Sequence, residues 1–158
     1  MSNEFNKYFK LASEATIEGM KKGHGGPFGA VVVKNGKIIG EGWNQVTSAN
    51  DPTAHAEVSA IRSACKNLNH FELDGAEIYT SCEPCPMCLA AIYWARIEKI
   101  YYANTRKDAA DIQFDDDLIY QEIPKDISQR KIEMKQLLRD EAHQVFKEWE
   151  NKQDKIRY

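Results

Sequence analysis

The sequence lacks any long hydrophobic run. About 42% of its 158 residues are hydrophobic, yet no stretch approaches the roughly 18 consecutive apolar residues that a membrane-spanning helix needs. The first residues also lack the basic-then-apolar layout of a secretory signal peptide. We therefore expect a cytoplasmic protein with a sizeable core and a length typical of one domain.

An excess of basic charge is missing as well. Lysine and arginine together number 21 against 24 acidic residues, which gives a net charge of −3. A protein that binds nucleic acid through phosphate contacts usually carries a basic face. The one lysine-rich stretch, residues 125–158, alternates in sign and is typical of a solvated helix face. We therefore expect no nucleic-acid partner.

Cysteine is scarce but clustered. The sequence has four cysteines, and Cys82, Cys85 and Cys88 fall in one short segment while Cys65 stands apart. Disulfides are rare in the cytosol, where clustered cysteines indicate metal or redox chemistry.

No internal repeat, low-complexity tract or linker divides the chain, which predicts a single domain over residues 1–158. Apolar spacing, turn residues and β-branched runs predict the elements. Helices are expected at 3–21, 53–66, 87–95 and about 140–150, and strands at 30–34, 37–43, 77–80, 99–103 and within 131–138. Asn35-Gly36 predicts a hairpin between the first two strands. The alternation predicts an α/β fold, with a mixed sheet of about five strands between helices.

Two segments carry candidate metal ligands. Cys85 and Cys88 are three residues apart, so both thiols lie on one face at the start of a helix. A helix N-terminus favours negative charge and therefore thiolates. His55, ahead of the other helix, adds an imidazole. Three protein ligands leave a fourth tetrahedral position for water, which is typical of catalytic zinc.

Glu57 follows the histidine by two residues. Two thiolates already neutralise the charge of Zn²⁺, so the metal should acidify its water less than a site of three neutral histidines would. A general base is then needed nearby, and Glu57 is the candidate. The alternatives are an iron–sulfur run, a structural zinc site closed by Cys82, and iron in place of zinc.

Longer stretches around these residues resemble a known family. They are residues 26–32, 50–57 and 79–96, together with the acidic Phe114-Asp115-Asp116 and the terminal Tyr158. The pair H-x-E and P-C-x-x-C is the signature of zinc nucleobase deaminases. The chain resembles the small bacterial guanine deaminases over nearly its whole length. The resemblance implies a three-layer αβα cytidine-deaminase-like fold and conversion of guanine to xanthine and ammonia.

The resemblance also implies a site and an assembly. One zinc per subunit would be bound by His55, Cys85 and Cys88, with Glu57 as the catalytic proton shuttle. The purine base would be bound by Phe28, Trp94, Asn44, Asp116 and Tyr158. Similar enzymes form homodimers whose carboxyl-terminal segment crosses to the partner subunit, which could also contribute Trp94. A carboxylate such as Asp116 suits the ring N–H groups of guanine.

Three other functions stay open at this point. A tRNA-editing adenosine deaminase shares the zinc segments but would need a basic surface for RNA. A deaminase acting on cytosine, a nucleoside or another aminated heterocycle is a second alternative. A non-catalytic zinc module would instead use a fourth protein ligand, for which Cys82 is the candidate.

Overall fold

The computed structural model describes residues 3–158, which form two compact units. The first unit ends at Asp116, and the second runs from Asp117 to Tyr158. The first contains α1 (Asn3–Lys21), β1 (Gly29–Lys34), β2 (Lys37–Trp43), α2 (Val46–Ala49), α3 (Ala56–Leu68), β3 (Ala76–Cys82), α4 (Pro86–Trp94), β4 (Lys99–Asn104) and α5 (Arg106–Asp111). The second contains α6 (Asp117–Glu122), the 3-10 helix η1 (Ile127–Gln129) and α7 (Arg139–Asn151).

The sheet of the first unit is mixed, as the sequence predicts. Its strand order is β2-β1-β3-β4. β1 pairs antiparallel with β2 and with β3, and β3 pairs parallel with β4. Asn35 and Gly36 form the β1–β2 turn with φ angles of 51° and 72°, which confirms the predicted hairpin. These positive φ angles explain why Asn-Gly stands there.

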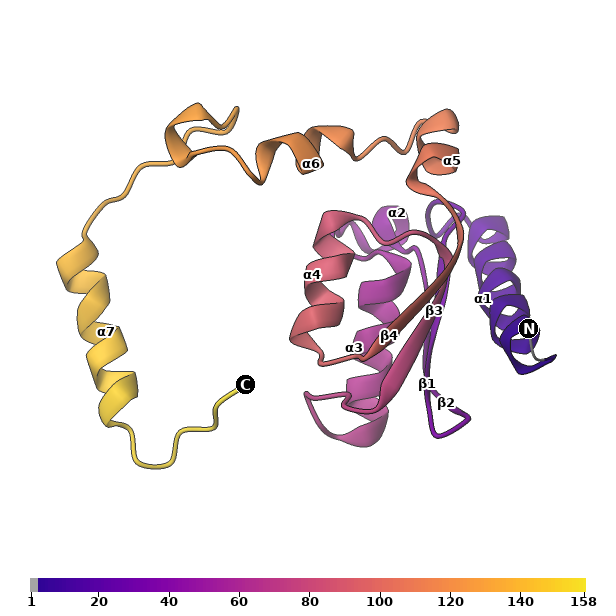
Figure 1. Cartoon of the computed structure of the whole chain (residues 1–158), viewed down its shortest axis with the longest axis horizontal. Helices are drawn as coiled ribbons and strands as arrows, with labels where there is room; N and C mark the ends of the chain where they lie inside the picture. The colour runs from indigo at the N-terminus through magenta and orange to yellow at the C-terminus, as the bar shows by residue number, and fades with distance from the viewer. Residues whose placement is uncertain (1–2) are drawn as a thin grey trace. The chain divides into compact units, whose positions relative to one another are not determined.

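Helices cover both faces of this sheet, which confirms the three-layer αβα architecture. α1 packs on one face, and α3 and α4 pack on the other (Figure 1). Along β1 the side chains alternate between the two layers. Ala30 and Val32 join the core beneath α3 and α4, whereas Val31 and Val33 join the core beneath α1. Because both faces are covered, β1 is almost continuously apolar.

The predicted strand within residues 131–138 is wrong. That stretch has no regular secondary structure, and the sheet has four strands among the described residues rather than about five. Two apolar residues of this stretch, Ile132 and Met134, are exposed by 79% and 51%. A strand needs a neighbour to pair its backbone, and the second unit itself contains only helices and loops.

The sequence also missed the short helices α2, α5, α6 and η1, which span only three to six residues each. Segments this short complete barely more than one turn, so they show no apolar period. Within residues 3–158, no helix combines the length and apolar character required to cross a membrane.

Candidate metal and catalytic site

The three predicted metal ligands meet where two helices begin. His55 is the N-cap of α3, and Cys85 is the N-cap of α4, with Pro86 at the first helical position. Both caps have extended backbone, with ψ angles of 160° and 168°. Proline at the first position suits a helix start because its fixed φ is already helical. Cys88 lies one turn further along α4.

The distances between the ligand atoms fit a tetrahedral zinc ion. His55 Nδ1 lies 3.6 Å from the Sγ of Cys85 and 3.5 Å from the Sγ of Cys88. All three ligand atoms lie within 4.8 Å of one another. Zn–N bonds of about 2.0–2.1 Å and Zn–S bonds of about 2.3 Å at tetrahedral angles place nitrogen and sulfur roughly 3.5–3.6 Å apart. The cluster therefore has the dimensions that zinc requires.

The pKa values of the two cysteine thiols also favour the binding of a cation. A hydrogen bond from Cys88 and the neighbouring His55 together lower the pKa of Cys85 to about 4, although burial opposes this shift. The same hydrogen bond and burial raise the pKa of Cys88, because a second negative charge beside the first is unfavourable. A divalent cation removes this conflict and allows both sulfurs to be thiolates.

Cys82 does not complete a four-ligand site. Its thiol donates to the backbone oxygen of Thr105 at 3.5 Å, and burial raises its pKa to about 11. Among the described residues, the metal-ligand cluster contains only His55, Cys85 and Cys88. This argues against the structural-zinc and iron–sulfur alternatives and favours a site with a position left for water.

Glu57 lies beside this cluster in the first turn of α3 and is only 6% exposed. Its Oε1 accepts a hydrogen bond from the hydroxyl of Thr80 at 3.0 Å. Burial raises the pKa of Glu57, although hydrogen bonds from its own backbone N–H and from Cys88 and Thr80 oppose that rise. A carboxyl whose pKa is raised by burial holds a proton more readily than an exposed one, which suits a group that transfers protons.

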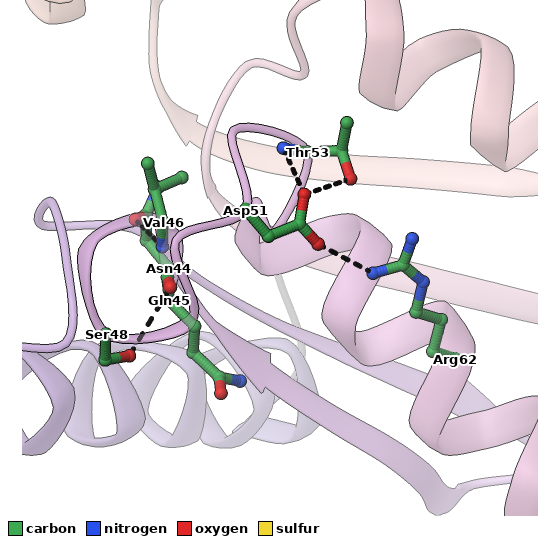
Figure 2. A network of polar contacts seen from close by, with 7 residues as sticks. All are labelled: Asn44, Gln45, Val46, Ser48, Asp51, Thr53 and Arg62. Carbon is green, nitrogen blue, oxygen red and sulfur yellow. Dashed lines mark hydrogen bonds and ion pairs between the residues drawn. The ribbon is translucent and has the colours of Figure 1, made fainter.

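A polar network fixes the loop that carries His55 (Figure 2). Asp51 Oδ1 accepts from the backbone N–H and the hydroxyl of Thr53 at 2.8 and 2.7 Å. Nη1 of Arg62 on α3 lies 3.6 Å from Oδ2 of Asp51. The backbone oxygen of Thr53 accepts from the N–H of His55 at 2.8 Å. The network therefore orders the turn from which the imidazole extends.

Asn44 lies directly after β2 and is 6% exposed. Its Oδ1 accepts from the backbone N–H groups of Gly26 and Val46, each at 3.2 Å (Figure 2 shows the second contact). Both contacts use the oxygen, so the amide nitrogen is left as a donor. The N–H of Gln45 donates to the oxygen of Ala54 at 2.9 Å, which joins this loop to the one before His55.

Two more predicted residues come close to the same region. Phe28 accepts a backbone hydrogen bond from Asn44 at 3.0 Å, and its ring packs edge-on against Phe114 with centroids 4.9 Å apart. Asp116 is partly buried. Burial raises the pKa of Asp116, and the charge of Cys85 adds to that rise, so the carboxyl is within electrostatic range of the metal-ligand cluster.

The last two predicted residues, Trp94 and Tyr158, are exposed. Trp94 ends α4 and is 64% exposed, while Tyr158 belongs to the second unit and is 74% exposed. Their roles in substrate binding remain predictions.

Two residues that touch this site had no function predicted from the sequence. Thr80 contacts Glu57, and Phe114 contacts Phe28. A signal existed for Thr80, because it is the polar residue at an inward position of a strand where Ala76 and Ile78 are apolar. Phe114 gave no such signal, since it stands between Gln113 and a run of three aspartates.

Comparison with known proteins agrees with this geometry. The cytidine and deoxycytidylate deaminase zinc-binding region matches residues 2–104. Guanine deaminase of Bacillus subtilis (strain 168) is 52% identical over 151 residues, which cover 96% of this chain and 97% of that protein. The X-ray structure of guanine deaminase from Bacillus subtilis has a TM-score of 0.94 at 51% identity, covering 100% of this chain and 99% of the other.

A second type of relative matches less of the chain. The tRNA-specific adenosine deaminase of Aquifex aeolicus (strain VF5) is 42% identical over 100 residues, which cover 63% of this chain and 66% of that protein. The metal-ligand cluster, the buried carboxyl beside it and these matches lead to one conclusion: the chain belongs to the cytidine and deoxycytidylate deaminase zinc-binding family.

Proposed function

We propose that this chain catalyses the zinc-dependent hydrolysis of guanine to xanthine and ammonia. The observation that carries the proposal is a three-ligand cluster with zinc dimensions beside the buried carboxyl of Glu57. The choice of guanine is supported by the relative that matches almost the full length of the chain. Purine breakdown or salvage is the corresponding metabolic role.

His55, Cys85 and Cys88 would hold the zinc, which would supply Lewis-acid activation of a water molecule. Glu57 accepts a proton from the attacking water and delivers it to the ring nitrogen beside C2 of guanine. The same carboxyl then takes the remaining proton of the added hydroxyl and carries it to the departing amine. In the balanced reaction one water adds its oxygen to C2 and one ammonia leaves. Burial strengthens the polar interactions made by Glu57 because little water competes for them.

Three side chains recognise the base in this proposal. Phe28 stacks on the purine, which selects a flat ring without identifying it. The amide nitrogen of Asn44 donates to an acceptor atom of the base, because its oxygen is already engaged by two backbone N–H groups. Asp116 accepts from a ring N–H, which is a strong charge-assisted bond.

Glu57→Gln tests the proton shuttle. Glutamine keeps the size of the side chain and an acceptor for Thr80 but cannot carry the proton. We expect normal zinc content and a fall in kcat of at least about 100-fold, the lower end for loss of general acid–base catalysis. Glu41→Gln, at an exposed position of β2, is the matched control. Zinc retention with a near-normal rate would show that the shuttle is another group.

A substrate panel tests guanine against the alternative activities. Purified protein is incubated with guanine, guanosine, adenine, cytosine and a tRNA anticodon stem, and ammonia is measured. We expect rapid release from guanine alone. Release from the RNA alone would instead support the tRNA-editing alternative, which the shared zinc-binding region makes the nearest rival.

We also propose that the protein is a cytoplasmic homodimer whose carboxyl-terminal segment packs on the partner subunit and which binds no nucleic acid. Two sets of exposed apolar side chains support the dimer. In the first unit Tyr93 and Trp94 are exposed by 71% and 64%. In the second unit Val145, Phe146 and Trp149 on α7 are exposed by 62%, 71% and 45%. Exposed apolar surface of this kind favours association.

Mixing two inactive variants tests whether the partner supplies Trp94. Trp94→Ala and Glu57→Gln are each expected to have low activity as homodimers. If Trp94 acts across the dimer, a mixed dimer contains one site with both residues intact, so mixing restores guanine turnover. Mixing without any recovery, in preparations shown to exchange subunits, would place Trp94 in its own subunit or outside the site.

A further inference from the structure

Thr80 is a polar residue in the middle of the apolar sheet. It lies on β3 opposite Ala30 of β1 and Tyr102 of β4, and its exposed fraction is 0%. On the same face of β3, Ala76 and Ile78 belong to the core beneath α3 and α4. The position of Thr80 in the strand therefore calls for an apolar side chain.

Packing alone does not explain the hydroxyl. Valine has almost the same shape as threonine and suits a buried strand at least as well. A buried hydroxyl is unfavourable unless it is hydrogen-bonded. Thr80 Oγ1 lies 3.0 Å from Glu57 Oε1 and 3.0 Å from the backbone oxygen of Cys82. The partner that gives the hydroxyl a function is the carboxyl of Glu57.

We propose that Thr80 is a positioning residue, whose hydroxyl holds the Glu57 carboxyl in the orientation that proton transfer requires. The inference rests on the shuttle role proposed for Glu57. A hydrogen bond at Oε1 fixes the rotation of the carboxyl group about its last side-chain bond, so Oε2 is also held in one direction. Small errors in the orientation of a catalytic group are costly, because proton transfer needs a short and aligned contact.

The position of β3 in the sheet stabilises the contact between Thr80 and Glu57. β3 pairs with β1 on one side and with β4 on the other, so the strand that carries Thr80 is held in place from both sides. Glu57 lies on a helix that packs against the same sheet. The contact therefore joins two elements of one core, 23 residues apart in the sequence.

The backbone oxygen of Cys82 is a second acceptor for the Thr80 hydroxyl. It allows Thr80 to hold the Glu57 carboxyl in both its protonated and its deprotonated form. A threonine hydroxyl has one hydrogen and two lone pairs. It can donate to Oε1 of Glu57 when that oxygen is bare. It can also accept from a carboxyl that carries the proton, while its own hydrogen turns to the oxygen of Cys82. Both arrangements keep the same heavy-atom distances, so the carboxyl need not move during the reaction.

Substitution of Thr80 tests the proposal. In Thr80→Val we expect kcat to fall by about 10–100-fold, the usual effect of removing a supporting hydrogen bond at a metal site. KM for guanine, the inhibition constant of xanthine and the zinc content should not change. Thr80→Ser keeps the hydroxyl and should restore most of kcat. Thr80→Ala, which lacks the hydroxyl, should behave like the valine variant.

Thr16→Val is the matched control. Thr16 is also buried, at 8% exposed, and its hydroxyl donates to the oxygen of Ala12 within α1 at 2.7 Å, on the opposite face of the sheet. The same change of threonine to valine there should leave kcat unchanged. Should Thr80→Val fold poorly, the comparison of serine with alanine at position 80 still separates the hydroxyl from the packing.

A normal kcat in Thr80→Val overturns the proposal, as does an equal loss of kcat in the serine and valine variants. A rise in KM with normal kcat also overturns it, because substrate binding would then be the affected step. Glu57→Gln is measured in parallel. If that variant is active, the proposed shuttle role fails; if it is inactive while Thr80→Val is normal, only the positioning role fails.

Discussion

The orientation of the Asn44 amide leads to a prediction that separates stability from recognition. Asn44 Oδ1 accepts from two backbone N–H groups, and the amide nitrogen is the group that can face the base. Asn44→Asp keeps an acceptor for both N–H groups but replaces the donor by a second acceptor. Asn44→Ala removes both functions. We therefore expect both variants to lose activity but only the alanine variant to lose stability.

The sizes of the two effects follow from the contacts. In Asn44→Ala the N–H groups of Gly26 and Val46 lose their shared acceptor. Each unsatisfied buried group costs about 1–3 kcal/mol, but both sites are only partly buried, so we expect about 2 kcal/mol in total. For a chain of this size that lowers Tm by roughly 4–8 °C. In Asn44→Asp a lost donor facing a new negative charge should lower kcat/KM at least about 100-fold, or roughly 3 kcal/mol.

Thermal unfolding and guanine kinetics of the three proteins test this reasoning together. The aspartate variant should unfold near the temperature of the parent protein and turn over guanine poorly. Unfolding of Asn44→Asp at a temperature as low as that of Asn44→Ala would contradict this prediction, because the bonds accepted by Asn44 Oδ1 would then not stabilise the fold. The prediction is equally contradicted if Asn44→Asp retains the kcat/KM of the parent protein.

Two further predictions concern the metal and the response to alkaline pH. Cys88→Ser should abolish zinc binding and guanine turnover, whereas Cys65→Ser should preserve both, because the Cys65 thiol lies outside the cluster on α3. Metal analysis, and activity measured after chelation and after zinc addition, check this prediction. A fully active Cys88→Ser variant with a full complement of zinc would contradict it. The second concerns Tyr79, whose hydroxyl donates to Glu77 at 2.8 Å. Burial, and to a smaller extent this hydrogen bond, raise the pKa of Tyr79 above its ordinary value of 10.0. The stability that Tyr79 contributes to the folded protein is therefore complete below about pH 10 and is lost as the pH rises further. Denaturant unfolding between pH 8 and 11 should therefore show a steeper alkaline loss for the parent protein than for Tyr79→Phe; parallel curves would show that Tyr79 does not contribute.

The two cysteine ligands could be predicted from the sequence because their geometry is local, whereas His55, 30 residues before Cys85, could be predicted only because the two segments together match the deaminase signature. The spacing of Cys85 and Cys88 within one helical turn, and the turn residues before each helix, need no knowledge of the rest of the chain. The same holds for the hairpin at Asn35 and Gly36. The strand predicted within 131–138 was wrong for the opposite reason. A local sequence pattern indicates at most that a strand can form, but only a neighbouring strand decides whether its backbone is paired.

The supporting contacts of the site could not be predicted because they join distant segments. Thr80 and Glu57 are 23 residues apart, and Gly26 and Asn44 are 18 apart. Their meeting depends on the strand order β2-β1-β3-β4 and on α3 packing across it. No local pattern determines that order. The orientation of the Asn44 amide, which decides whether this side chain offers a donor or an acceptor, also depends on the strand order.

The place of Glu57 in α3 resolves two opposing requirements of a proton carrier. Such a group must hold a proton during part of the reaction, and burial favours that by raising its pKa. It must also exist as a carboxylate before the reaction starts. The first turn of a helix favours negative charge, and hydrogen bonds from its own N–H, Cys88 and Thr80 lower the pKa. At a position two residues after the helix cap, a glutamate is therefore buried while the helix N-terminus and these hydrogen bonds offset part of the rise in its pKa; a glutamate later in α3 would lack the first-turn contribution.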